Sequence, residues 1–167
     1  LWQARHPTPP HPAPKPAPAV TGRRAVAVFG FRNLSRRPDA EWLSTALAEM
    51  IRTELGAAGS LRLIAGENVA RMLVELSLRE PDTLAADTLQ RIRANLGTDL
   101  VVFGSYLSLG EAGGGKIRLD LRVQDAATGE TVATLHEEGL ESGIFDVVSR
   151  AGAQLRERLG LGSVSPD

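Results

Sequence analysis

The sequence predicts one α/β domain with a mixed five-stranded sheet, in the element order β-α-β-α-α-β-β-β-α. Three observations support this fold class. Residues 25–31 and 99–109 contain short apolar runs bounded by turn residues, which are typical of buried strands. Apolar residues recur every three or four positions between residues 42 and 55, as in an amphipathic helix. Residues 116–124 alternate strictly between apolar and polar side chains, which indicates a half-exposed antiparallel strand.

The first part of the domain is expected to form a β-α-β unit. The buried strand over residues 25–31 is followed by a polar loop over residues 32–40, in which Asp39 is placed to cap the next helix. That helix should bury one apolar stripe, beginning with Trp42, and a second strand follows over residues 61–65. Because strands joined through a helix pair in parallel, we expect these two strands to be parallel.

Two helices are expected between this unit and the next strand. The first starts at Glu67 or Asn68 and is broken by the Pro-Asp pair at residues 81–82. The second spans residues 84–96 and ends at Gly97, a residue type that favours the left-handed backbone found after helix ends.

The second half of the domain predicts an antiparallel meander and a final helix. Its expected elements are strands over residues 99–109, 116–124 and 131–138, and a helix over residues 144–159. Gly129 is placed for a positive φ in the hairpin loop between the last two strands.

The two ends of the chain are expected to be linkers. Residues 1–24 contain seven of the ten prolines, and the densest run, residues 6–18, predicts a polyproline II spacer of roughly 40 Å. We interpret this arm as a stalk. The alternative is a ligand for an aromatic groove, because Pro7 and Pro10 form a P-x-x-P pattern. Residues 161–167 are interpreted as a C-terminal linker.

Charge and composition exclude several functions for the domain at residues 25–160. The chain has a formal net charge of −1, and residues 1–24 hold four basic and no acidic residues, so the remainder carries −5. An acidic domain is a poor nucleic-acid binder, because such binding displaces counterions with basic side chains. The chain has no Cys, which excludes disulfides, thiolate catalysis and iron–sulfur clusters. We expect no cofactor and no metal site.

No residue pattern predicts catalysis. Residues 110–116 fit the phosphate-loop pattern, but Ile117 replaces the required Ser or Thr and a strand follows where a helix is needed, so we interpret the segment as a hairpin loop. His136 is the domain's only histidine and is expected on a sheet surface. The adjacent glutamates at 137–138 should point to opposite sheet faces and form no acid pair.

One group of residues is a candidate binding site. It follows the carboxyl end of the first strand, where α/β sheets often hold ligands. The functional interpretation is an anion or peptide site, and the alternative is a solvated loop. The group consists of Arg32, Asn33, Ser35, Arg36 and Arg37.

A further pattern extends over nearly all of residues 25–160 and contains no catalytic motif. Its first part is an apolar strand, then Phe-x-Asn-Leu-Ser, then a Trp-Leu helix start; its second part ends in an Asp-x-x-Thr-Gly-Glu turn. The residues of the pattern are Phe31, Asn33, Leu34, Ser35, Trp42, Leu43, Gly97, Asp99, Gly104, Ser105, Tyr106, Asp125, Thr128, Gly129 and Glu130. In these residues the sequence resembles the TolB-like N-terminal domain family, whose relatives include FlgO, LpoB and CsgG.

The resemblance implies a non-enzymatic, extracytoplasmic module that binds a protein or a small ligand. The proline-rich and arginine-rich style is most similar to the segment after the membrane helix of bacterial receptor-type serine/threonine kinases with TPR repeats. The first residue is Leu1, so we expect a piece of a longer chain, periplasmic and tethered to the inner membrane upstream. The alternative is an envelope-assembly or secretion-associated lipoprotein-type subunit. It would act as a homo-oligomer, through the exposed strand at 116–124 or a neighbouring edge.

Overall fold

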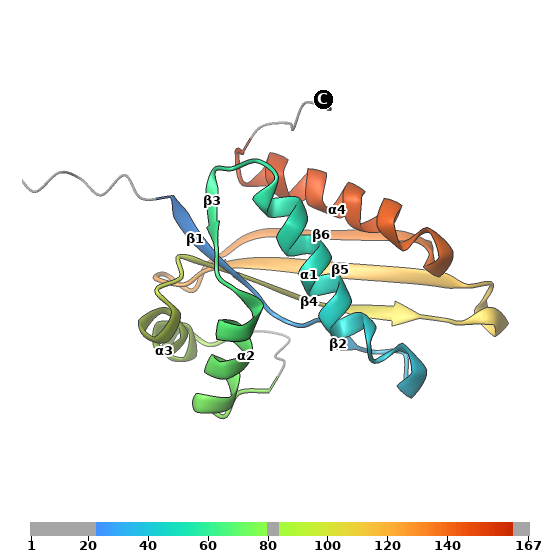
Figure 1. The fold of residues 1–167 in the computed structure, drawn as a ribbon, viewed down its shortest axis with the longest axis horizontal. Coiled ribbons are helices and arrows are strands. Elements are labelled where there is room, and N and C mark those ends of the chain that lie inside the picture. Colours follow the sequence, from blue (N-terminus) through green and yellow to red (C-terminus); the bar gives the residue numbers. More distant parts are fainter. Residues whose placement is uncertain (1–22, 80–83, 162–167) are drawn as a thin grey trace, which may run out of the picture.

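A computed structural model describes residues 23–79 and 84–161 and shows three layers, with α1 and α4 on one face of a sheet and α2 and α3 on the other (Figure 1). The strands are β1 (Arg24–Val28), β2 (Arg32–Asn33), β3 (Leu61–Leu63), β4 (Leu100–Ser108), β5 (Lys116–Asp125) and β6 (Thr131–Leu140). The helices are α1 (Leu43–Gly56), α2 (Gly66–Glu75), α3 (Ala86–Leu96) and α4 (Ile144–Arg158), with short 3-10 turns η1 (Pro38–Ala40), η2 (Glu111–Gly113) and η3 (Glu141–Gly143).

The strand order β3-β1-β4-β5-β6 confirms the predicted fold class and element order. β1 pairs in parallel with β3 and with β4, and β4, β5 and β6 form the expected antiparallel meander. The sheet has a sixth strand that the sequence did not predict, because β2 pairs with β4 inside the segment expected to be a loop. β2 continues the line of β1 along β4 after an interruption in which Phe29 and Phe31 enter the cores on opposite faces of the sheet.

Two apolar cores hold the layers together. Val26 and Val28 of β1 point into the core beneath α1 and α4, whereas Ala25 and Ala27 point into the core beneath α2 and α3. Side chains alternate between the two faces of a strand, so a strand with helices on both sides is apolar throughout. This explains why the first strand has no polar face in the sequence.

The described helices cover only one face of the second half of the sheet. α2 and α3 lie against β1, β3 and the start of β4, while β4, β5 and β6 run on beyond them (Figure 1). Along β5, Ile117 and Leu119 are buried beneath α1 and α4, and Arg118 between them is exposed. The alternation predicted for this strand is therefore confirmed. Its backbone, however, is paired on both sides, so β5 is not an edge through which copies could pair.

The start of α1 differs from the prediction. Asp39 lies in η1 and does not cap α1, which begins at Leu43. Trp42 was expected in the buried stripe but is 61% exposed. The buried stripe is centred on Leu43 and Leu47, so Trp42 lies on its flank, one residue before the first helical turn. By contrast, Gly97 ends α3 with φ 66°, as expected.

Some predictions concern residues outside the described ranges. The arm at 1–24 and the linker at 161–167 lie almost wholly outside the described residues, as does the expected break at 81–82, and β1 already begins at Arg24. Within the described ranges, no helix combines the length and the apolar character needed to cross a bilayer.

Candidate functional site

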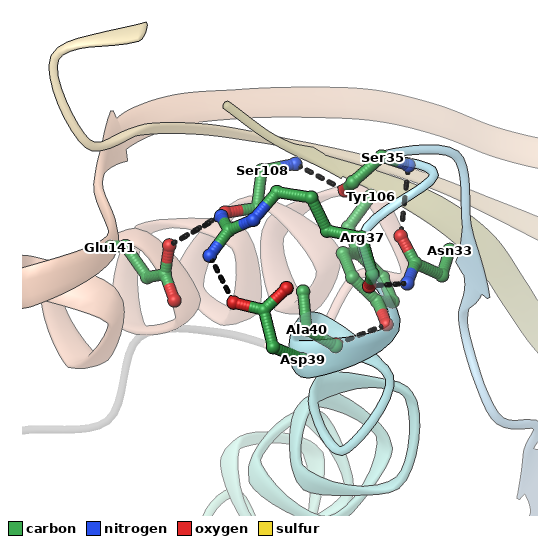
Figure 2. A network of polar contacts seen from close by, with 8 residues as sticks. All are labelled: Asn33, Ser35, Arg37, Asp39, Ala40, Tyr106, Ser108 and Glu141. Atoms are coloured by element: carbon green, nitrogen blue, oxygen red, sulfur yellow. Dashed lines mark hydrogen bonds and ion pairs between the residues drawn. The ribbon is translucent and has the colours of Figure 1, made fainter. Parts of the chain in front are cut away.

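The predicted site residues lie on the segment that runs from β2 through η1 to α1. Asn33, Ser35 and Arg37 come together at the carboxyl end of β4 and form one polar network with residues of other elements (Figure 2). Arg32 pairs with Ser105 in the sheet and so lies on the face opposite Asn33. Arg36 is exposed and has a φ of 55°.

Asn33 determines the shape of this segment. Its Oδ1 accepts a hydrogen bond from the Ser35 N–H at 2.8 Å, and its Nδ2 donates to the Arg37 carbonyl at 3.1 Å and to Glu41 Oε2 at 3.0 Å. A short amide side chain that bonds nearby backbone groups stabilises a turn. The turn also places Arg36 in the left-handed backbone region, which is unfavourable for residues other than Gly, Asn and Asp.

Hydrogen bonds to β4 hold the same segment against the sheet. The Leu34 N–H donates to the Tyr106 carbonyl at 2.9 Å, and the Ser108 N–H donates to Ser35 Oγ at 2.7 Å. The buried Tyr106 hydroxyl donates to the Ala40 carbonyl at 2.7 Å (Figure 2). Bonds at both ends therefore hold the segment against the sheet.

Arg37 connects three elements at this point. Its Nη2 donates to Asp39 Oδ2 at 2.6 Å, and its Nη1 donates to Ser108 Oγ at 3.0 Å and lies 3.6 Å from Glu141 Oε2. The Ser108 hydroxyl donates in turn to Glu141 Oε2 at 2.6 Å. Because the Arg37 guanidinium donates to Asp39, the pKa of that carboxyl is lowered, and the same bond raises the pKa of Arg37 with Glu141 adding to the effect.

These contacts weigh against the anion interpretation for Arg37, since two carboxylates already face its guanidinium. A Cβ added to Gly110, which has φ 64°, would lie 2.8 Å from Arg37 Nη1. The guanidinium therefore lies against the second residue of the β4–β5 hairpin loop. Residues 109–115 form that loop and Lys116 begins β5, so the hairpin interpretation of the phosphate-loop pattern is confirmed.

Several large apolar side chains are exposed at the same end of the molecule as this polar network. Six of the eight large hydrophobic residues exposed in the described part of the chain are sequence neighbours of its members or stand at the start of α4. The starts of α1 and α4 and the β4–β5 turn all lie at one end of the molecule (Figure 1). We call this set the apolar rim: Leu34 (46% exposed), Trp42 (61%), Leu107 (37%), Leu109 (45%), Leu140 (52%) and Phe145 (76%).

Two open hollows lie within this end. One, of about 450 Å³, is lined by the rim residues Leu107, Leu109 and Leu140 with Lys116, Ile117, Arg118, Glu138 and Gly139. The other, of about 400 Å³, lies beside the predicted segment and is lined by Asn33, Arg36, Arg37, Pro38 and Glu41. Leucine side chains make the first hollow largely apolar, whereas polar and charged residues line most of the second.

The sequence did not identify the rim as a surface. Trp42 was assigned to the core because helical spacing includes it, and Phe145 was not singled out. Leu107 and Leu109 follow the two-residue period of β4 on the face opposite Tyr106. This period predicts exposed leucines only when it is known that the helices on that face do not extend over them.

The structure also places the histidine and the two adjacent glutamates that were considered as catalytic or metal-binding residues. His136 is exposed on β6, as predicted. Glu137 pairs with Arg150 of α4 at 3.0 Å and Glu138 pairs with Arg118 at 3.3 Å, so the two glutamates lie on opposite faces, as expected. Across residues 23–79 and 84–161, no three His, Asp or Glu side chains are grouped as metal ligands would be.

The sequence matches no family model and no curated protein. Solved structures do share its fold. The LpoB C-terminal domain from Salmonella enterica is similar over 75% of this chain and 88% of its own, with a TM-score of 0.53 and 16% identity. The lipoprotein GNA1162 from Neisseria meningitidis is similar over 80% of this chain and 96% of its own, at a TM-score of 0.52 and 14% identity.

A subunit of a PelC dodecamer from Paraburkholderia phytofirmans is also similar, over 83% of this chain and 89% of its own, with a TM-score of 0.51 and 17% identity. At identities of 14–17%, these similarities establish the fold alone. They confirm the predicted architecture, for which LpoB was an expected example.

Proposed function

We propose that this chain is a non-catalytic, extracytoplasmic protein-interaction domain that binds its partner at the apolar rim. One observation supports this most strongly: six large apolar side chains are exposed at one end of the molecule, beside a network that fixes the backbone there. Leu107, Leu109 and Leu140 lie on the uncovered face of the sheet, and Trp42 and Phe145 stand at the starts of α1 and α4. Exposed apolar surface marks interaction sites, and aromatic side chains supply much of the energy at protein interfaces.

The polar network makes this surface suitable for binding. Asn33, Ser35 and Arg37 hold the segment between β2 and α1 in one conformation, so little conformational entropy is lost when a partner binds. Exposed Arg36 adds a charged group next to the hollow at this segment, and arginine is also enriched at interfaces. The surface therefore fits a protein partner with an apolar centre and an acidic margin.

Photo-cross-linking tests this proposal. Benzoylphenylalanine replaces Trp42 or Phe145 in the source cells, and the control replaces Val74, which is 79% exposed on α2 away from the rim. We expect both rim positions to give an adduct of the same mass, with a partner of the cell envelope, and the α2 position to give none. Equal labelling from all three positions, or none from the rim, would contradict the proposal.

We further propose that the domain is the sensor of a membrane-anchored bacterial serine/threonine kinase with TPR repeats, tethered to the inner membrane. The support is the resemblance in residues 25–160 together with the proline-rich lead-in. Reading the open reading frame on both sides tests it. An upstream membrane helix preceded by a kinase core is the expected result, and a lipoprotein signal with no kinase would overturn it.

The second candidate is an envelope-assembly or secretion-associated lipoprotein-type subunit that acts by oligomerisation. Two observations favour it: β6 is an open edge of the sheet, and the fold is shared with a protein described as a lipoprotein and with one described as a dodecamer. A lipoprotein signal upstream and a ring or filament in solution are its expected signs.

A further inference from the structure

β6 is an unusually open edge strand. It has ten residues and, among residues 23–79 and 84–161, pairs only with β5, whereas the opposite edge strand, β3, has three. Proteins normally protect long edges with Pro, Lys or a bulge, because an unpaired strand accepts another strand. β6 contains neither Pro nor Lys. The one register shift of its pairing lies near its start, where Val123 and Gln124 of β5 pair with Ala133 and Thr131 and leave Val132 of β6 unpaired as a bulge.

The outward backbone groups of β6 can be assigned from its hydrogen bonds. The Glu141 N–H donates to the Gly115 carbonyl at 2.7 Å, so from Ala133 onward alternation directs the odd-numbered residues toward β5 and the even-numbered ones outward. Arg150 Nη2 donates to the Glu138 carbonyl at 2.8 Å from the side of α4, which agrees with this assignment. Thr134, His136 and Glu138 therefore present N–H and C=O groups away from the sheet.

The exposed apolar residues of β6 are symmetric about His136. Val132, 42% exposed, lies four residues before it, and Leu140, 52% exposed, lies four residues after it. If a second copy pairs antiparallel about a two-fold axis at His136, the Leu140 of each copy comes to the bulged start of the other copy's strand, at Val132. Thr134 then faces Glu138, so no like charges oppose each other.

Other two-fold registers fit worse. A two-fold axis perpendicular to the sheet keeps each face matched and can also be centred on a neighbouring residue of β6. Centring on Leu135 places Val132 opposite Glu138. Centring on Glu137 brings His136 opposite Glu138 but places Leu140 opposite Thr134, so neither register joins the two apolar ends. Centring on Glu138 places that carboxylate opposite its own copy, which is destabilising. Centring on Thr134 leaves Leu140 beyond the end of the partner strand.

We propose that two copies of this chain pair antiparallel through β6 about a two-fold axis at His136 and so form one continuous sheet. The Arg150 contact does not prevent this, because a carbonyl oxygen has two lone pairs and can accept from the second copy as well. Leu140 belongs both to the apolar rim and to this pairing, but Trp42 and Phe145 do not lie on β6. Cross-linking from positions 42 and 145 and disulfide pairing at position 136 can therefore succeed or fail separately.

Single cysteines test the register, because the native chain has none. In a hydrogen-bonded antiparallel pair, opposed Cα atoms are about 5.5 Å apart, within disulfide range. His136→Cys would face itself. Thr134→Cys is the matched control: it is also exposed and on the same strand face, but its counterpart lies four residues along the pair, roughly 14 Å away.

Under mild oxidation of the 167-residue chain, we expect a covalent dimer from His136→Cys and at least tenfold less from Thr134→Cys. A second measurement uses no cysteine: in sedimentation, the native chain should dimerise, and Val132→Lys should weaken the dimer at least tenfold while the circular dichroism spectrum stays native. Equal cross-linking at 134 and 136, cross-linking at neither, or a native chain that stays monomeric would overturn the proposal.

Discussion

Arg37 and Glu141 meet at the carboxyl end of β4, with 3.6 Å between Nη1 and Oε2 and the Ser108 hydroxyl bound to both. This contact joins the segment after β2 to the start of α4, two parts of the chain that are far apart in sequence. Because both side chains are partly exposed, we assign the pair a positional role more than a large share of the folding energy.

The Ser108 hydroxyl should be the structural centre of this network. It is buried, donates to Glu141 and accepts from Arg37. We expect Ser108→Ala to lower the free energy of unfolding by about 1–2 kcal/mol, because buried polar partners lose a hydrogen bond. Urea denaturation measures this, and hydrogen exchange should rise over residues 33–41. Unchanged exchange in that segment would show that Ser108 does not hold it.

Tyr106 provides a cleaner test of how the segment is anchored. Its hydroxyl donates to the Ala40 carbonyl at 2.7 Å, while its ring fills the core beneath α1. Tyr106→Phe keeps the packing and leaves that carbonyl without its donor, so we expect a loss of about 1–2 kcal/mol in urea denaturation. A loss below about 0.3 kcal/mol would mean that water replaces the hydroxyl without cost.

Gly104 should tolerate no side chain. A Cβ there would lie 1.9 Å from the Asp120 carbonyl oxygen of the neighbouring strand and 2.9 Å from the Phe31 ring. We expect Gly104→Ala to destabilise the domain by about 2 kcal/mol or more, because the strands must separate. Gly56→Ala, at the end of α1, is the control: its nearest atom is 3.9 Å away, so thermal unfolding should change little or improve.

The Asp125 turn should make stability depend on acid pH. Oδ1 accepts hydrogen bonds from the N–H groups of Thr128 and Ala127, which lower the pKa of this carboxyl. Because the folded pKa lies below the unfolded value of about 3.9, the stabilisation is present above that pH and is lost as pH falls through the folded pKa. Asp125→Asn keeps an acceptor but no charge, so its unfolding free energy should fall less between pH 6 and about pH 2. Parallel curves for the two proteins would contradict this.

The strands and the fold class could be predicted because burial leaves a local pattern. β5 alternates because one face is covered, and the first strand is apolar throughout because both faces are covered. The end of α3 at Gly97 could also be predicted, because glycine is favoured where the backbone has a positive φ.

The candidate site could be located but not interpreted from the sequence. The position of Asn33 and Ser35 after the first strand was sufficient to expect a functional loop. The partners of Arg37 come from β4 and η3, and only the register of the folded sheet brings Ser108 and Glu141 to it. Trp42 was misassigned for a related reason: helical spacing gives a stripe, but the neighbouring elements decide which edge of that stripe is covered.

The exposed aromatic residues should matter for binding and not for folding. Trp42→Ser should change the unfolding free energy by less than about 0.5 kcal/mol, because the side chain is 61% exposed. Leu47→Ala, in the fully buried stripe of the same helix, should cost about 2–5 kcal/mol. A large loss of stability in Trp42→Ser, measured by urea denaturation, would show that the residue belongs to the core after all.

The most direct measurement is competition for the photo-cross-linked adduct formed from position 145. Excess native chain and excess Val74→Ser chain should suppress the adduct equally, because α2 lies away from the rim. Excess Trp42→Ser chain should suppress it at least tenfold less, since it folds but lacks one aromatic anchor of the apolar rim. Equal suppression by all three chains would contradict the claim that this end of the molecule is the binding surface.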